Sequence, residues 1–452
     1  MRNQQLPKKK KMTLLLLDKH FTQTWLGADF LTPLSQRFDL IVATPLNIKN
    51  KLEFEMDDVV FHYFTRSWST RSQRVLFNLN WVGNRSKSSS FRFWLQRDIL
   101  GNEIWNVRNR SYLFSKLKGI AIRAAKNPTI FLAFIPPFRF TLFNLLKCVE
   151  YFENRTKDYL PKDTEIVVIP SQGGAEWDLP EIIRNCSRKK ILSVLAVDNW
   201  DNLTSKQVLR FKPDFVTVMG PRAVDQAIEI HGLREASVLP IGLPRFDTYR
   251  KPFKSKSLSK LESECFRINY LGFSLPYDEI SVINKLVLDL KKYKNPPIEI
   301  NYRPHPGRKN RLVEAIPDDK IVVLQSPTSE HSQYVIPNPK EYADEFMDYD
   351  LVVASPTTMA IEIMALGRPC IIDATQDGIH RTSAGKAFEN YTHMQDLTTV
   401  PELHIARTYE ELLEFVIKFY FNRPTTMNYQ LDHLVNLQKK TYIEQLIDSL
   451  PQ

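Results

Sequence analysis

The segment 302–308 (YRPHPGR) places an imidazole between two prolines and two arginines. It follows the apolar run 298–302, which is typical of a buried strand. Guanidinium groups bind phosphate oxygens well, and an imidazole can donate a hydrogen bond or a proton near neutral pH. A solvated basic turn would leave the same letters. We nevertheless predict that Arg303, His305 and Arg308 bind the phosphate groups of a ligand.

A second group of polar side chains lies in the segment 350–369 (DLVVASPTTMAIEIMALGRP), which reads as strand, hydroxyl-rich turn, helix and glycine turn. Ser355, Thr357 and Thr358 would lie at the start of the helix, where unpaired backbone N–H groups and the helix dipole favour an anion. Ordinary helix capping accounts for only one hydroxyl. We therefore predict a cradle for nucleotide phosphate, with Glu362 one turn into the helix.

The first half of the chain has its own polar turn after the apolar run 165–169. Here Gly173 and Gly174 are followed by Glu176. Paired glycines let a ligand approach the backbone closely, although a simple loop explains them equally well. We expect these three residues to contribute to binding of an acceptor.

A further polar turn, 198–206 (DNWDNLTSK), follows the apolar run 191–197. Asp198 and Asp201 are candidates for a general base. The amide and ammonium groups of the same turn could orient an acceptor hydroxyl; they belong to Asn199, Asn202 and Lys206. The alternative is an Asx-rich turn that caps the next helix.

Short apolar runs separated by helix-like segments indicate βαβ units and parallel sheets. In the first half the expected strands are 13–17, 40–43, 59–63, 165–169, 191–197, 215–219 and 237–240. In the second half they are 267–271, 298–302, 321–324, 351–354 and 369–372. Because such strands end at one edge of their sheet, all four polar turns are expected at ligand-binding edges.

The domain boundaries follow from a polar, serine-rich stretch between these two series of strands. We predict an N-terminal Rossmann-like acceptor domain over 1–250, a linker over 251–264, a C-terminal Rossmann-like nucleotide-donor domain over 265–425 and a C-terminal helix within 426–452. Residues 68–127 show too little periodicity for their elements to be assigned.

Several function classes lack their sequence signatures. The chain has no GxGxxG after a first strand, no GxxxxGK[ST] and no HExxH. We therefore expect no dinucleotide cofactor, no P-loop chemistry and no protein-bound metal. The four cysteines have no CxxC spacing, which favours a reduced, cytoplasmic setting over a disulfide framework.

The charge balance favours phosphate-bearing partners. Lys and Arg number 61 and Asp and Glu 51, a net charge of +10. The basic residues are dispersed and no RNA or DNA motif occurs, so nucleic acid is not expected. The apolar segment 129–146 contains two prolines and an arginine, which argues against a membrane span. A buried strand followed by a helix fits it better, and contact with an anionic inner leaflet remains open.

The RPHP turn together with the SPTT–Glu–GRP element resembles GT-B glycosyltransferases of bacterial surface polysaccharides. The likeness is to polysialyltransferases, Kdo transferases of capsule synthesis and CDP-glycerol glycerophosphotransferases. It covers about residues 165–375 and is weak before 160. Each motif is short, and their order and strand-end positions carry the resemblance.

This resemblance implies an α/β fold of two Rossmann-like domains facing across a cleft. It gives His305 contact with donor phosphate and a general-acid role, gives Ser355, Thr357 and Thr358 donor-phosphate binding, and gives Glu362 the donor ribose. It matches no acidic base, so Asp198, Asp201 and Glu176 stay candidates on chemistry alone.

The expected activity is therefore metal-independent transfer of a sugar or polyol phosphate from a nucleotide-activated donor to a glycan or lipid-linked acceptor, in capsule or lipopolysaccharide synthesis. The enzyme would work in the cytoplasm or at the inner face of the membrane. Two alternatives stay open. One is a UDP-sugar 2-epimerase, and the other is a non-catalytic nucleotide- or glycan-binding protein.

Overall fold

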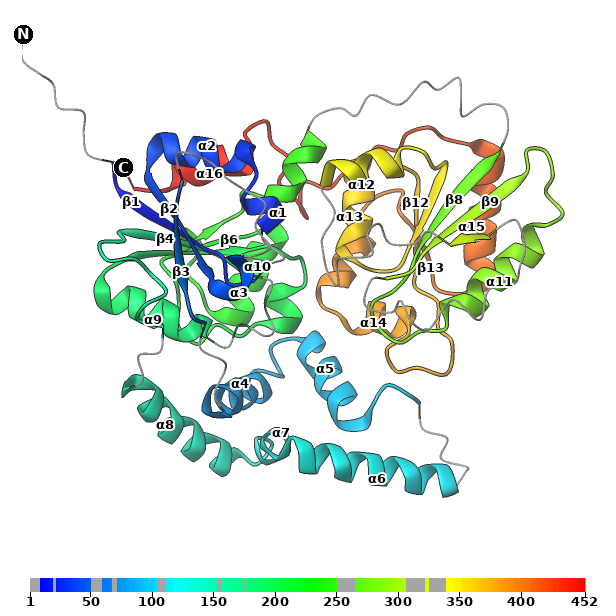
Figure 1. The fold of residues 1–452 in the computed structure, drawn as a ribbon. Coiled ribbons are helices and arrows are strands. Elements are labelled where there is room, and N and C mark those ends of the chain that lie inside the picture. The colour runs from blue at the N-terminus through cyan, green and yellow to red at the C-terminus, as the bar shows by residue number, and fades with distance from the viewer. Residues whose placement is uncertain are drawn as a thin grey trace, which may run out of the picture. The chain divides into compact units, whose positions relative to one another are not determined.

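The computed structural model describes residues 9–18, 22–49, 59–66, 71–104, 110–152, 156–171, 173, 176, 178–250, 265–305, 322–324 and 339–451. The chain forms two compact units (Figure 1). Unit 1 consists of Met1–Lys87, Thr129–Asp247 and Asp432–Gln452, and unit 2 of Ser88–Pro128 and Thr248–Leu431.

Unit 1 contains a seven-stranded parallel sheet in the order β3-β2-β1-β4-β5-β6-β7. Its strands are β1 (Lys11–Leu15), β2 (Asp39–Pro45), β3 (Val60–Phe64), β4 (Ile166–Ser171), β5 (Leu192–Val197), β6 (Phe215–Thr217) and β7 (Val238–Leu239). Its helices are α1 (Thr22–Trp25), α2 (Ala28–Arg37), α3 (Leu46–Lys49), α4 (Arg71–Gly83), α8 (Pro136–Phe152), α9 (Leu179–Lys189), α10 (Pro221–His231) and α16 (Tyr442–Ser449). Helix α7 (Pro128–Leu132) begins at the boundary between the two units.

Alternate residues of the unit 1 strands enter two separate cores. Leu14 and Val168 belong to the core under α2 and α16, whereas Leu15 and Val167 belong to the core with α9 and α10. This alternation is what a sheet covered on both faces requires, because successive side chains point to opposite faces. Figure 1 shows α2 and α16 side by side over one face of the sheet.

Unit 2 contains a six-stranded parallel sheet in the order β10-β9-β8-β11-β12-β13. Its strands are β8 (Phe266–Leu271), β9 (Ile298–Arg303), β10 (Val322–Leu324), β11 (Leu351–Ala354), β12 (Cys370–Asp373) and β13 (His404–Ala406). Its helices are α5 (Ser89–Leu100), α6 (Arg110–Lys126), α11 (Glu279–Leu290), α12 (Pro339–Phe346), α13 (Thr358–Ala365), α14 (Ala384–Asn390) and α15 (Tyr409–Asn422). Helices α11 and α15 pack on one face of this sheet.

The structure differs from the expected boundaries in its discontinuous segments. Ser88–Pro128 belongs to unit 2 and Asp432–Gln452 to unit 1. Two contacts join helix α5 to the rest of unit 2. Phe93 lies edge-on to Tyr391, and the hydroxyl of Ser88 forms a hydrogen bond with that of Thr392. Such long-range packing leaves no local periodicity. The expected linker 251–264 lies outside the described residues.

Two further expectations were wrong in their elements. No strand forms in the segment 129–146, which contains α7 and most of α8. The C-terminal helix is limited to α16, because the preceding described residues contact the strand ends of unit 1 through backbone hydrogen bonds, from Asn436 to Met219 and from Arg222 to His433. Within the described part of the chain, no helix combines the length and apolar character needed to cross a bilayer.

Candidate functional site

The strand order of unit 2 creates a switch point between β8 and β11. The chain runs outward from β8 through β9 to β10 and then returns to β11 on the other side of β8. Open α/β sheets bind ligands outside the carboxyl ends of the strands at such a point. Three turns meet there. Gly272 follows β8, His305 follows β9 and Ser355 follows β11.

Backbone contacts hold these three turns together. The N–H of Gly272 donates to the carbonyl oxygen of Arg303 at 2.9 Å, and a Cβ on Gly272 would lie 3.0 Å from the backbone nitrogen of His305. On the other side, the hydroxyl of Ser355 donates to the carbonyl oxygen of Leu271 at 3.2 Å. His305 and Ser355 therefore lie on either side of the end of β8.

A buried carboxylate fixes the turn after β8. Glu279, the first residue of α11, is fully buried and accepts a hydrogen bond at 2.7 Å from the N–H of Phe273 and another at 2.7 Å from the hydroxyl of Tyr302. Its carboxylate oxygens would both lie 3.2 Å from a Cβ on Gly272. The sequence analysis missed Glu279; its signal is an acidic residue directly after the Asp278 helix cap.

A second buried carboxylate, Asp373 at the end of β12, joins two tyrosines beneath this edge. The hydroxyls of Tyr270 and Tyr277 donate to it, and the N–H of Thr375 donates to it at 3.0 Å. Burial, reinforced by the Asp373 carboxylate, raises the pKa of both tyrosines well above the usual value. They therefore stay neutral donors, and the network gives the sheet edge a fixed hydrogen-bonded base.

The start of α13 leaves its hydroxyl groups uncommitted to capping. Thr357 is the N-cap residue in extended conformation, yet its side chain makes no capping hydrogen bond. Thr357 and Thr358 are partly exposed. The hydroxyl of Thr357 therefore does not act as an ordinary helix cap. The N–H of Ala360 in this turn donates to the carbonyl oxygen of Thr357 at 3.1 Å, and the helix dipole favours negative charge at this end of α13.

Two predicted donor residues have partners inside unit 2. Arg303 donates to Glu345 at 2.8 Å and lies over the ring of Tyr342, with 4.3 Å from its Cζ to the ring centroid. Glu362 is buried and accepts a hydrogen bond at 2.6 Å from the hydroxyl of Tyr249. The predicted residue Arg308 lies outside the described residues.

In unit 1 the corresponding switch point lies between β1 and β4. Ser171, the last residue of β4, donates its hydroxyl to Glu176, and the N–H of Gly173 donates to the same hydroxyl at 3.2 Å. The amide of Asn202 donates to the carbonyl oxygen of Ser171 at 3.0 Å. The structure therefore brings together three of the predicted acceptor residues. Gly174 lies outside the described residues.

The polar turn after β5 forms a short π-helix, Asn202–Lys206, where the sequence indicated an ordinary turn. Such π-turns occur frequently at functional sites. Asp201, directly before it, forms an ion pair with Lys206 at 2.9 Å, and Asn199 accepts a hydrogen bond from Arg245 at 3.2 Å. Asp198 is only 3% exposed, and its N–H donates to Ser171 at 2.9 Å.

A cation on the other side of Glu176 was missed by the sequence analysis. Arg66, two residues after β3, donates to both carboxylate oxygens of Asp178 at 2.8 Å and to the carbonyl oxygen of Leu17 at 2.7 Å. This bidentate pair ties the ends of β1, β3 and α9 together. In the sequence, the segment around Arg66 looks like any exposed basic turn, so its pairing with Asp178 becomes visible only in the fold.

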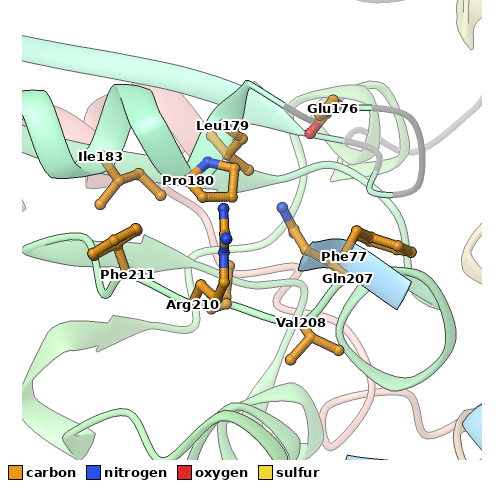
Figure 2. A pocket seen from close by; sticks show the side chains of 10 residues that line it. Phe77, Glu176, Leu179, Pro180, Ile183, Gln207, Val208, Arg210 and Phe211 are labelled. Carbon is orange, nitrogen blue, oxygen red and sulfur yellow. The ribbon is translucent and has the colours of Figure 1, made fainter. Parts of the chain in front are cut away.

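Glu176 also forms part of a pocket in unit 1 (Figure 2). Its apolar lining is Phe77, Leu179, Pro180, Ile183, Val208, Leu209 and Phe211, and its polar lining is Glu176, Gln207 and Arg210. Figure 2 shows the side chain of Arg210 extending toward Pro180, with Phe211 on one side and Gln207 on the other. The pocket therefore combines apolar walls with a few polar groups, the usual composition of a small-molecule subsite. Among the described residues, no cluster of His, Cys, Asp and Glu has the geometry of a metal site.

No protein-family model matches the sequence, and no curated protein matches it either. Solved structures do match the fold. A UDP-N-acetylglucosamine 2-epimerase described as putative, from Listeria monocytogenes, has a TM-score of 0.51 at 10% identity, over 98% of this chain and 95% of that one. The UDP-GlcNAc 2-epimerase from Methanocaldococcus jannaschii has a TM-score of 0.50 at 10% identity, over 96% and 98%.

The wall teichoic acid polymerase TagF is similar at a TM-score of 0.46 and 11% identity, over 98% of this chain and 88% of that chain. At these identities the comparisons bear on the fold alone. The predicted fold class is confirmed: the chain is an α/β protein of two Rossmann-like domains, the organisation of GT-B enzymes.

Proposed function

We propose that this chain transfers a glycosyl or polyol-phosphate unit from a nucleotide-activated donor to a glycan or lipid-linked acceptor in surface polysaccharide synthesis. One observation carries the proposal. Gly272, His305 and Ser355 come from three different strand ends and converge at the switch point of unit 2, directly before α13. That is the position where a Rossmann-like domain binds a nucleotide.

On the donor side, charge develops on the departing nucleotide phosphate during transfer. His305 is partly exposed and can donate a hydrogen bond or proton to that phosphate, and the hydroxyls of Thr357 and Thr358 can add two more donors. The dipole of α13 favours the same negative charge. We propose that these groups replace a metal cation. Arg303 supports the site less directly, because its guanidinium already contacts Glu345.

On the acceptor side, an inverting reaction needs a base for the acceptor hydroxyl. We assign this role to Glu176. Its carboxylate is partly exposed at the switch point of unit 1 and accepts a hydrogen bond from Ser171. The two other candidates have weaker support, because Asp198 is almost fully buried and Asp201 forms an ion pair with Lys206.

A UDP-sugar 2-epimerase is the second candidate, since the similar structures from Listeria monocytogenes and Methanocaldococcus jannaschii carry that name, the first as putative. The fold is common to both reactions, so products must separate them. An epimerase converts a nucleotide sugar without any acceptor. A transferase releases free nucleotide and lengthens a glycan. A non-catalytic binding protein would bind nucleotide and do neither.

Nucleotide binding is the first test. Thermal unfolding of the full chain is measured with CMP, CDP, UDP and GDP, because a ligand at 100 times its Kd adds about 2.7 kcal/mol of stability. We expect one base to raise the unfolding temperature, and His305→Ala and Thr357→Val to reduce that rise. Thr398→Val is the matched control, because this exposed threonine hydroxyl bonds only locally to Gln395. No response to any nucleotide would overturn the proposal.

Catalysis is tested with the nucleotide sugar that gives the largest shift. We expect Glu176→Gln to keep nucleotide binding and to lower kcat by about 10²–10⁴, the range for loss of a general base. Unchanged turnover in this variant would exclude Glu176 as the base. Binding that occurs with no turnover in the presence of varied acceptors would favour the non-catalytic alternative.

A further inference from the structure

Helix α6 in unit 2 presents apolar side chains to solvent. Phe114 is 79% exposed, and Leu117 and Ile122 are about half exposed. They share one face of the helix with the exposed Lys118, which lies one turn from Phe114. None of the described side chains of α6 is buried. The helix therefore carries its apolar side chains on the face that its own unit leaves uncovered.

Helix α8 in unit 1 also exposes large apolar side chains. Phe140 is 72% exposed and Leu145 is 60% exposed, and Phe138 in the first turn is also exposed. No described side chain of α8 is buried. The exposed Lys147 lies two turns from Phe140 and therefore on the same face. A core-packing helix would show the opposite pattern, with its apolar side chains buried.

These two helices belong to one unusual stretch of sequence. Among the described residues, fourteen large apolar side chains are exposed, and nine of them fall within residues 104–145. Four of these nine side chains belong to unit 2 and five to unit 1, and on each unit exposed apolar side chains gathered in this way mark a candidate interaction site. Between Glu103 and Glu150 the sequence has eight Lys or Arg residues and no Asp or Glu. Of these eight cations Lys116 is paired with Glu103, and the segment as a whole remains strongly basic.

Charge decides between the occupants of these faces. A second copy of the chain would bring the same excess of positive charge against itself, which is unfavourable. An anionic bilayer supplies negative charge for the lysines and an apolar layer for the phenylalanines. Basic helices with exposed phenylalanine and leucine are typical of segments that lie in the membrane interface.

We propose that α6 and α8 each bind the surface of an anionic lipid bilayer. Phe114 and Phe140 enter the boundary between head groups and acyl chains, while Lys118 and Lys147 contact the anionic head groups. The contact itself rests on exposure and charge. Its purpose, access to a lipid-linked acceptor, rests on the proposed function.

The test is sedimentation of the full chain with vesicles. Phosphatidylcholine vesicles are compared with phosphatidylcholine mixed with phosphatidylglycerol, at low and high salt. We expect binding only to the anionic vesicles and a marked decrease with salt, because attraction to a charged surface is screened.

Serine substitutions test each helix by itself. Phe114→Ser with Leu117→Ser in α6, and Phe140→Ser with Leu145→Ser in α8, are each expected to lower the vesicle partition coefficient by about tenfold or more. The matched control combines Leu288→Ser and Phe421→Ser, since these side chains are 65% and 69% exposed in α11 and α15. We expect this control to bind vesicles like the unsubstituted chain.

Three results would overturn the proposal. The first is equal binding to neutral and anionic vesicles, and the second is unchanged binding in both helix variants. The third is a dimer that light scattering detects in the absence of vesicles and that the substitutions in either helix abolish. The last result would identify a protein interface instead. Nucleotide-induced thermal shifts are measured on the same variants and should be unchanged, so failure of the nucleotide site leaves the vesicle result interpretable.

Discussion

Replacing Gly272 by alanine tests the packing of the candidate donor site most directly. The added Cβ would lie 3.0 Å from the backbone nitrogen of His305 and 3.2 Å from both carboxylate oxygens of Glu279. Neither neighbour can move freely. The Glu279 carboxylate is held by Phe273 and Tyr302, and the His305 nitrogen belongs to the backbone that follows β9.

The expected cost follows from these distances. Overpacking a tight site costs about 1–3 kcal/mol, and the loss of glycine's unfolded-state freedom returns about 0.4–1 kcal/mol. We therefore expect Gly272→Ala to lower the free energy of unfolding by about 1–2 kcal/mol. For a unit of this size that corresponds to a decrease of about 2–8 °C in Tm. Because the strain falls on His305, nucleotide affinity should decrease as well.

The assay is chemical unfolding together with nucleotide titration of the same samples. Gly27→Ala is the matched control, because a Cβ there meets nothing within 4 Å. Equal stability of the two variants would refute the argument that the turn after β8 is packed tightly against His305 and Glu279. A stability loss without any change in nucleotide affinity would refute only the link from this packing to the donor site.

Three further predictions concern the remaining ends of the sheets. Burial raises the pKa of Asp377, but the imidazole and backbone N–H groups that hydrogen-bond this carboxylate hold its pKa below the usual value. The ionised carboxylate therefore stabilises the fold above the unfolded-state pKa, and this stabilisation is lost as the pH falls through the folded-state pKa. The Tm difference between the unsubstituted chain and Asp377→Asn should therefore shrink on acidification from pH near 6 to pH near 3, and a constant difference would contradict this. Arg66→Ala leaves the 3%-exposed side chain of Asp178 without its bidentate partner and should cost about 1–3 kcal/mol in urea unfolding, which Asp178→Asn should partly restore in the double variant. Gly220→Ala would place a Cβ 2.4 Å from the carbonyl oxygen of Leu434, so limited proteolysis should cleave the C-terminal segment faster, and an unchanged digestion pattern would contradict the tight contact.

Much of the fold could be predicted because parallel strands buried on both faces appear as short apolar runs. The runs at 165–169 and 351–354 correspond closely to β4 and β11. Strand β13 escaped notice because His404–Ala406 is short and contains a histidine. Helix α6 escaped because its exposed face is apolar, which removes the usual amphipathic signal.

The site could be predicted only as far as strand ends determine it. His305 and Ser355 lie at the same edge of the sheet because parallel strands end at one edge, which the sequence reveals. The partners of Arg303 and Glu362 could not be predicted, since Glu345 and Tyr249 come from other elements. Asn202 gains its position from a π-turn, and no local sequence pattern predicts such a turn.

The return of the chain to unit 1 has a consequence for biosynthesis. Tyr442, Ile443 and Leu446 pack into the same core as Trp25 and Phe30. The ribosome therefore releases the opening strands of this lobe long before the side chains that complete their packing exist. During that interval unit 2 can mature as it emerges. A premature stop codon ahead of Tyr442 should thus destabilise unit 1, although its opening strands are translated first. The dependence of folding on chaperones should fall sharply once α16 has been made.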